Sequence, residues 1–224
     1  MRKSSTYVFW LLWVTNVSGQ GTFQNLDFEN GIVPDGSHGF VEFSSAFPGW
    51  TGYTGTQQVS YAFYPAPAIG TAVVTLLATD VFEAVRIAGN YSAVLQSGFG
   101  PGGPTFNVGV SLAQTGLVPA GTMSLHFLAH DDFRGGAMVL MDGQSLSLVP
   151  VQTLNGYEEY AADISQYAGQ TAELRFVRPY IAGGANFVLD NISFSSIGVP
   201  EPSTWALLAF GGALFWFAAR RRRK

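Results

Sequence analysis

Between residues 20 and 197 the chain is made of short runs rich in Val, Ile, Thr, Phe and Tyr, separated by Gly, Pro, Asn and Asp. Short β-branched and aromatic runs bounded by turn residues are typical of β-strands, and helix signals are few. Residues 123–129 and 172–178 alternate apolar and polar side chains, which indicates strands with one face in the core. The sequence therefore predicts an all-β sandwich or barrel.

The predicted strands cover most of this body. In residues 187–194 the apolar phase shifts around Asp190-Asn191, which predicts a bulge or a polar site within that strand. Strands are expected at residues 22–29, 57–63, 72–79, 91–96, 105–112, 122–129, 137–141, 146–149, 158–162, 171–178 and 186–194.

Two groups of turn residues predict specific local structure. Asp142-Gly143 joins two apolar runs, and this dipeptide is a strong short-range signal for a β-hairpin. Residues 163–169 can form one helical turn, with Asp163 as its N-cap and Gly169 as its end.

The N-terminal residues 1–19 are expected to be a signal peptide. Arg2-Lys3 provides a basic start, and residues 7–14 form an apolar segment too short to cross a bilayer. Val17-Ser18-Gly19 has the small residues of a cleavage site. The body, residues 20–197, is therefore expected outside the cytoplasm.

The C-terminal residues 198–224 have three parts: Pro200-Glu201-Pro202, an apolar run, and the cations Arg220, Arg221, Arg222, Arg223 and Lys224. The uncharged residues 203–219 would span about 25 Å as a helix, at the short end of what crosses a bilayer. A transmembrane helix is predicted at 204–219, with the cations in the cytoplasm by the positive-inside rule. The alternative is a plain, permanently retained anchor.

This three-part tail resembles the PEP-CTERM sorting signal, which in that family is processed by a membrane transpeptidase called exosortase. The resemblance implies that Pro200, Glu201 and Pro202 are the recognition motif and that residues 204–219 are a transient anchor. It also implies that Arg220–Lys224 act as a cytoplasmic stop signal. The implied partners are an exosortase-type transpeptidase, the membrane and exopolysaccharide, and the implied destination is the cell surface or the extracellular matrix.

The charge of the body excludes one class of partner. Residues 20–197 hold four arginines, no lysine and 14 carboxylates, so their formal charge is 4 − 14 = −10. Nucleic acids and anionic membrane surfaces are bound by clustered cations, so neither is expected as a partner. The chain has no cysteine, which excludes disulfides, thiolate metal sites and cysteine nucleophiles.

The body resembles the galactose-binding-like jelly rolls that occur as carbohydrate-binding modules. Residues 25–31 resemble their opening strand and turn, and Pro48-Gly49-Trp50 resembles their early Gly-Trp. Residues 161–170 resemble the segment before the penultimate strand, and residues 189–194 the closing strand. The resemblance implies an antiparallel jelly-roll β-sandwich with a glycan ligand.

Asp27, Glu29 and Asp190 are candidate calcium ligands. In the jelly rolls that the body resembles, the opening and closing strands lie side by side and often hold a structural calcium ion at their end. Calcium takes six to eight oxygen ligands, among them carboxylates. The alternative is that Asp27 and Glu29 are solvated on an edge strand and that Asp190 caps a bulge.

Tyr53, Tyr61 and Tyr64 are candidate glycan contacts. They lie in an aromatic, Gly- and Pro-rich segment, and an exposed ring can stack on the C–H face of a pyranose while its hydroxyl forms hydrogen bonds. Trp50, which follows Pro48-Gly49, is expected in the core instead.

No catalytic motif stands out. The chain lacks Gly-x-Ser-x-Gly and His-Glu-x-x-His, and in a strand His126 and His130 would lie about 13 Å apart, too far to share one metal ion. The sequence therefore predicts an exported, non-enzymatic surface or matrix protein. The alternatives are a carbohydrate-binding module with a specific glycan ligand and, less favoured, a secreted glycan-active hydrolase.

Overall fold

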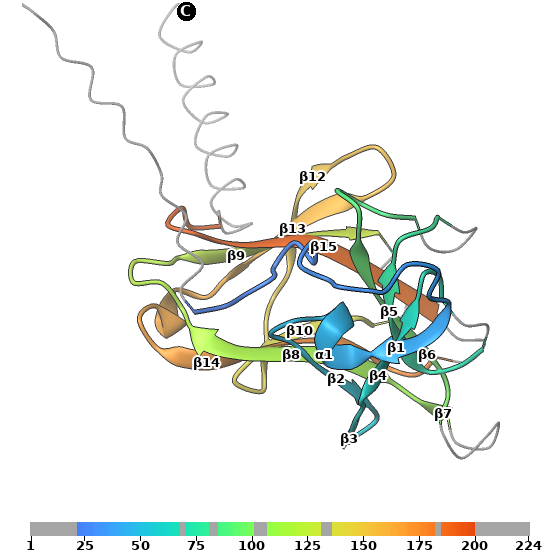
Figure 1. Ribbon diagram of the computed structural model, residues 1–224. Coiled ribbons are helices and arrows are strands. Elements are labelled where there is room, and N and C mark those ends of the chain that lie inside the picture. Colours follow the sequence, from blue (N-terminus) through green and yellow to red (C-terminus); the bar gives the residue numbers. More distant parts are fainter. Residues whose placement is uncertain are drawn as a thin grey trace, which may run out of the picture.

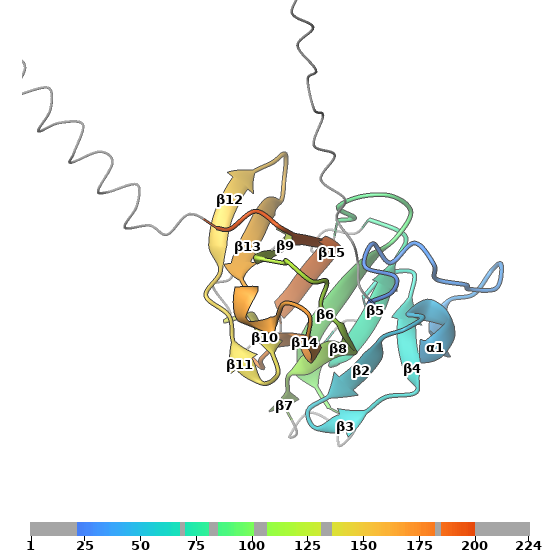
Figure 2. The same ribbon diagram turned by 90° about the vertical axis from the view of Figure 1, so that its left-hand side faces the viewer.

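The structure, a computed structural model, describes residues 22–67, 70–80, 85–100, 107–130, 136–181 and 185–199. In these residues the chain forms two β-sheets that pack face to face as a sandwich (Figure 1; Figure 2). The prediction of an all-β body is therefore confirmed.

Several predictions concern residues outside this range. They are the signal peptide at 1–19, the sorting motif Pro200-Glu201-Pro202, the transmembrane helix at 204–219 and the stop signal at 220–224. The described part of the chain contains no helix with the length and hydropathy needed to span a bilayer.

The larger sheet has the strand order β1-β4-β5-β6-β15-β9-β13-β12, and β7 pairs with β6. All of its pairs are antiparallel except the short contact between β4 and β5. Its strands are β1 (Gly39–Glu42), β4 (Tyr61–Tyr64), β5 (Val73–Leu77), β6 (Ser92–Phe99), β7 (Asn107–Val108), β9 (Ser124–His130), β12 (Val149–Thr153), β13 (Glu158–Asp163) and β15 (Ala185–Ser195).

The smaller sheet has the order β11-β10-β14-β8-β2-β3. Its strands are β2 (Thr51–Thr54), β3 (Gln57–Gln58), β8 (Val110–Leu117), β10 (Met138–Met141), β11 (Gln144–Ser145) and β14 (Thr171–Arg178). Within the described residues, two short helices accompany the sheets, α1 (Phe43–Ala46) and the 3-10 helix η2 (Ser165–Tyr167).

Aromatic rings join the two sheets in the core. Phe127 of β9 meets Phe176 of β14 edge-on, with ring centroids 5.3 Å apart. The ring of Trp50 lies 6.3 Å from that of Phe176, and its Nε1–H donates to the carbonyl of Asn25 at 2.9 Å. The prediction that Trp50 lies in the core is confirmed, because its side chain is buried and its one polar atom has a partner.

The predicted local features are present. Asp142 and Gly143 have φ angles of 48° and 74°, and Met141 pairs with Gln144 across this hairpin. The register of β15 shifts between Asp190 and Ser193, which is the predicted bulge. The helical turn is confirmed as η2, but its N-cap is Ile164 and not the predicted Asp163, whose Oδ1 accepts from the Ser165 N–H at 2.8 Å just before the helix.

The strand predicted at residues 22–29 is wrong. Asn25 and Phe28 have φ angles of 51° and 59°, and the Asn25 side chain accepts a hydrogen bond from the Asn30 backbone N–H at 2.9 Å. The left-handed φ angles of these two residues turn the backbone away from an extended conformation. The apolar side chains of the segment therefore reach the core from turns and not from a strand. The strand at 146–149 is also wrong, because β12 begins only at Val149.

The predicted strands leave out β1, β2 and the two-residue β11. β2 holds Gly52, and glycine has a low strand propensity, so no strand was expected at this position. In the structure Gly52 faces the ring of Phe43, which a Cβ at this position would overlap. The requirement for glycine comes from this tertiary contact.

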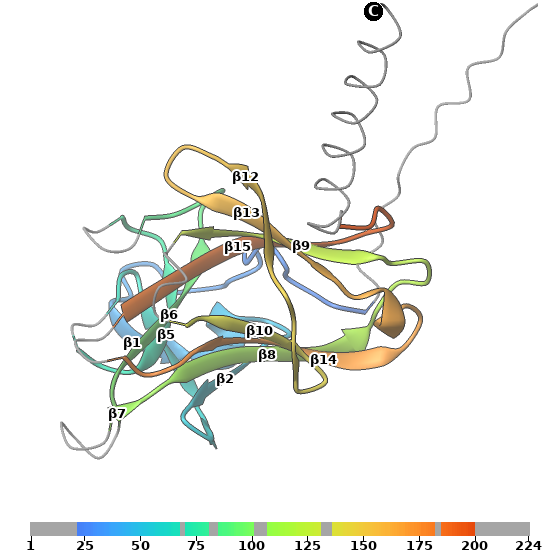
Figure 3. The same ribbon diagram turned by 180° about the vertical axis from the view of Figure 1, so that it is seen from behind.

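The sandwich has two distinct ends, joined by β8, which runs the length of the smaller sheet (Figure 3). An eight-residue strand spans about 24 Å. At the Leu117 end, Thr22 N–H donates to the Leu117 carbonyl at 3.3 Å, and Met123 N–H donates to the Ser195 carbonyl at 2.8 Å. Both ends of the described chain therefore lie near Leu117. At the other end of β8, Val110 pairs with Thr54 of β2.

Candidate functional site

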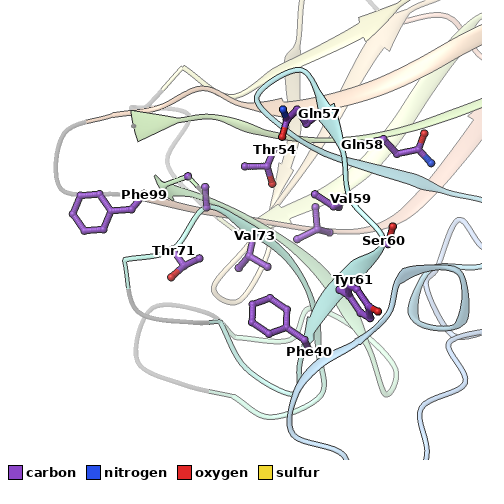
Figure 4. Close-up of a pocket in the computed structure, with 13 residues that line it drawn as sticks. Phe40, Thr54, Gln57, Gln58, Val59, Ser60, Tyr61, Thr71, Val73 and Phe99 are labelled. Carbon is purple, nitrogen blue, oxygen red and sulfur yellow. The ribbon is translucent and has the colours of Figure 1, made fainter. Parts of the chain in front are cut away.

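A groove of about 530 Å³ opens between the two sheets at the Val110 end of the sandwich (Figure 4). One wall is formed by β2, β3 and the segment that follows them, and the other by β1, β4, β5 and the end of β6. Its floor is apolar, with Val59 on one side and Val73 and Val74 on the other. The groove is the point at which the core space between the sheets opens to solvent.

Three exposed aromatic side chains border the groove. Phe40 of β1, Tyr61 of β4 and Phe99 of β6 are 64%, 52% and 45% exposed, respectively. Figure 4 shows Tyr61 and Phe99 on opposite sides of Val73. All three residues belong to strands. The ring of Phe63 also packs edge-on against the ring of Phe40, with centroids 5.1 Å apart.

The polar side chains of the groove are uncharged. Gln57 and Gln58 of β3 are exposed, and Thr54, Ser60 and Thr71 add hydroxyl groups. Amides and hydroxyls both donate and accept hydrogen bonds. Since the lining holds no ionisable group except the phenol of Tyr61, the groove suits a neutral ligand that carries hydroxyl groups and apolar faces.

Of the three predicted glycan tyrosines, only Tyr61 lines the groove. Tyr64 is half-buried and packs against the core. Tyr53 belongs to the other sheet, and the guanidinium carbon of Arg175 lies 4.4 Å from the centroid of its ring. Hydrogen bonds to Glu173 hold that guanidinium and raise the pKa of Arg175.

Sequence reasoning missed Phe40, Phe99, Gln57 and Gln58. No local pattern marks them, because they come from three strands and the sheets bring them together only after folding.

The predicted calcium ligand Glu29 is bound by backbone N–H groups. Its Oε1 accepts from the N–H groups of Asn90 and Tyr91 at 2.8 and 2.9 Å, and its Oε2 accepts from Asn90 Nδ2 at 2.9 Å. Glu29 therefore ties the N-terminal turn to the segment before β6.

Asp190 is bound to the same segment and is only 1% exposed. Its Oδ2 accepts from the Ser92 hydroxyl at 2.7 Å and the Ala88 N–H at 3.2 Å, and its Oδ1 accepts from the Asn191 N–H at 2.7 Å. Burial raises the pKa of Asp190 to about 7, although these hydrogen bonds oppose the shift. We call Glu29, Asp190 and residues 88–92 the carboxylate clasp.

The clasp does not have the form of the predicted calcium site. The described residues hold no group of three or more His, Asp or Glu side chains that could bind a metal ion. Asp27 remains in a separate exposed turn, where Oδ1 accepts from the Glu29 N–H at 3.3 Å. The side-chain oxygens of Glu29 and Asp190 accept hydrogen bonds from residues 88–92. This segment of the chain therefore links the two carboxylates.

A second polar constellation lies on the larger sheet, where β9 and β13 pair. His126 Nδ1 is 2.8 Å from Glu159 Oε1, and His126 Nε2 is 2.9 Å from Ser124 Oγ. Ser124 is fully buried and donates to the carbonyl of Ile197 at 2.6 Å. Each ring nitrogen of His126 thus has one polar partner, and the Ser124 hydroxyl proton goes to Ile197.

Comparison with known proteins identifies the tail. Residues 198–223 match the model of the PEP-CTERM protein-sorting motif. The match supports export, transient membrane anchoring and sorting to the cell surface through an exosortase system. No curated protein matches the chain.

Solved structures resemble the body only distantly. An apo cyclase from Fischerella sp. has 15% identity and a TM-score of 0.43, over 78% of this chain and 94% of the cyclase. A Stig cyclase, Fisc, from Fischerella sp. TAU in complex with an indole compound has 15% identity and a TM-score of 0.43, over 81% and 98%. The enzymatically active domain of tailspike protein 4 from bacteriophage CBA120 has 20% identity and a TM-score of 0.37, over 66% and 19%.

These comparisons correct one prediction. The sequence predicted a non-enzymatic body, but the three solved structures described above are two cyclases and the enzymatic domain of a tailspike. The prediction of a non-enzyme is therefore not retained.

Proposed function

We propose that the chain is an exported protein whose sorting tail delivers it to the cell surface, where its sandwich binds neutral exopolysaccharide in the groove. The proposal includes the signal peptide at 1–19, the transmembrane helix at 204–219 and a body of the carbohydrate-binding jelly-roll type. The sorting motif at 198–223 supports the delivery, and the chemistry of the groove supports the ligand.

The observation that carries the proposal is the set of exposed rings beside uncharged amides. Phe40, Tyr61 and Phe99 offer apolar ring faces at the groove, and such faces stack on the C–H surfaces of pyranose rings. Gln57 and Gln58 can bond sugar hydroxyls from the facing strand. A few polar groups in a largely apolar concavity are typical of ligand sites.

Charge selects a neutral polysaccharide over an anionic one. The groove lining contains no cation, and the body carries a formal charge of −10. A uronic-acid or sulfated chain would find no partner for its charges and would be repelled by the body. A neutral hexose chain meets neither obstacle.

Removal of a groove ring is expected to weaken binding. Tyr61→Ala and Phe99→Ala should each lower the affinity for a bound neutral polysaccharide roughly fivefold, since a stacked ring contributes on the order of 1 kcal/mol. A glycan array would identify the ligand, and affinity electrophoresis would measure the change. Val151→Ala, which shortens an exposed side chain of β12, is the matched control and should bind like the parent. Absence of binding across all neutral glycans would rule out this ligand class.

The second candidate is a hydrolase with Ser124 as its nucleophile. Ser124, His126 and Glu159 are hydrogen-bonded in the order of a serine–histidine–acid triad, with Nε2 toward the hydroxyl and Nδ1 toward the carboxylate. In the described state the hydroxyl proton is donated to Ile197 and not to His126. Catalysis would therefore require residues 195–199 to move off Ser124 first.

Active-site labelling tests this candidate. If Ser124 is a nucleophile, a fluorophosphonate probe should label the full chain, and both Ser124→Ala and His126→Ala should abolish labelling. Glu159→Gln should slow labelling roughly tenfold or more, because the carboxylate orients and charges the imidazole. Labelling that survives Ser124→Ala, or no labelling of the parent, would exclude Ser124 as a nucleophile.

A further inference from the structure

The body fixes the point from which the sorting tail leaves. Ser124 Oγ donates to the Ile197 carbonyl at 2.6 Å, and the Ile197 N–H donates to Ser195 Oγ at 3.0 Å. On the neighbouring strand, the Met123 N–H donates to the Ser195 carbonyl at 2.8 Å. Ile197 is therefore held on the sandwich, and the predicted transmembrane helix begins seven residues later, at most about 25 Å away.

The surface around this point is partly apolar, and the ionisable side chains Asp163, which is exposed and pairs with Ser124, and His126, which is hydrogen-bonded to Ser124 Oγ, lie at its border. We define the tail end as residues 117–124, 164–171 and 195–199, which together contain no Asp, Glu, Lys, Arg or His. Within it Leu117, Met123 and Ile197 are 41%, 44% and 63% exposed. The tail end takes residues from both sheets, because Leu117 ends β8 of the smaller sheet and Met123 precedes β9 of the larger one.

A lipid surface is the partner that fits these properties. Contact with a bilayer interface would bury the three apolar side chains without desolvating any ionised group of the tail end. The absence of cations means that the contact does not depend on anionic lipids. The short chain between Ile197 and the apolar run keeps the tail end close to the bilayer for as long as the tail is inserted.

We infer that the tail end rests on the bilayer while the sorting tail is inserted, and that this contact points the groove away from the membrane. The groove lies at the opposite end of β8, about 24 Å from Leu117. In this orientation the mouth of the groove faces outward and remains open to polysaccharide before the tail is processed. The inference rests on the proposed sorting function and adds an orientation to it.

Single-cysteine labelling tests this orientation, because the chain has no cysteine of its own. Leu117→Cys, Met123→Cys and Ile197→Cys would each carry an NBD fluorophore, in the full chain reconstituted into phosphatidylcholine vesicles. Ile32→Cys, Phe40→Cys and Val151→Cys are controls, because these side chains are at least as exposed as Leu117 but lie outside the tail end. We expect a blue-shifted emission and quenching by spin-labelled lipid at the first three positions only.

Leu117 is the decisive position, because Ile197 would lie near the membrane through the tail alone. Vesicle-bound chains in which Leu117 and the controls give the same emission would overturn the orientation and leave the sorting proposal standing. Failure of the chain to float with the vesicles would overturn membrane anchoring, and the orientation with it.

Discussion

Between pH 4 and pH 7 the sandwich is expected to lose roughly 4 kcal/mol of unfolding free energy through Asp190 alone. In the folded chain the pKa of this carboxyl is raised from 3.8 to about 7, chiefly by burial. The folded state therefore keeps a proton that the unfolded state has released. Stability from this group is complete below about pH 4, falls as the pH rises through the folded-state pKa of about 7, and levels off about one pH unit above it.

The position of Asp190 in the carboxylate clasp explains the size of the effect. Its side chain is buried at the bulge of β15, and the negative charge of Glu29 further disfavours ionisation. The hydrogen bonds from Ser92, Ala88 and Asn191 oppose the shift without cancelling it. Ionisation thus places a second negative charge in the segment that joins the N-terminal turn to β6.

Asp190→Asn is the variant that tests this prediction, because the amide cannot ionise. Urea unfolding at intervals from pH 4 to pH 8 should show the parent losing stability relative to the variant. The variant should be about 1 kcal/mol less stable at pH 4, since its amide leaves one of the N–H groups without an acceptor. Asp163→Asn, at an exposed turn, is the control and should keep the pH dependence of the parent. A parent-to-variant difference that does not change with pH would show that Asp190 does not titrate in this range.

Phe176→Ala is expected to destabilise the sandwich by about 3–5 kcal/mol, the range for loss of a fully buried phenylalanine. Phe176 is completely buried on β14, and its ring contacts Phe127 of the opposite sheet and Trp50 before β2. Truncation would leave a cavity between the sheets and remove the main aromatic contact that joins them. The loss is a large part of the stability of a typical domain.

Phe99→Ala is the matched control for this second prediction. It deletes the same side chain at the rim of the groove, where the ring is 45% exposed, so the loss should be about 1 kcal/mol or less. Denaturant unfolding of both variants measures the two effects, and the groove variant should still lose polysaccharide binding. Equal destabilisation by the two substitutions would contradict the assignment of Phe176 to the centre of the core.

The sequence by itself determined the all-β class and several local details. The alternation in residues 172–178 predicted β14, because side chains of a strand point to opposite faces and only one face is buried. The Asp142-Gly143 hairpin and the bulge at Asp190 were also predicted from neighbouring residues. Neighbouring residues determine which backbone conformations are sterically allowed and which side chains of a strand alternate between its faces. The sorting tail is likewise a contiguous motif, and it could be read directly.

Tertiary structure alone decided the groove and the clasp, and the apolar residues of the segment 22–30 hid its turns. Leu26 and Phe28 looked like strand residues, but they reach the core through turns fixed by Asn25. The groove brings Phe40 close to Phe99, and the clasp brings Glu29 and Asp190 to the same segment. The residues of each pair lie far apart in the sequence, so no local sequence pattern predicts that they meet. The physical reason is that strand formation follows from local sterics, whereas the meeting of side chains depends on which strands pair and on how the two sheets pack.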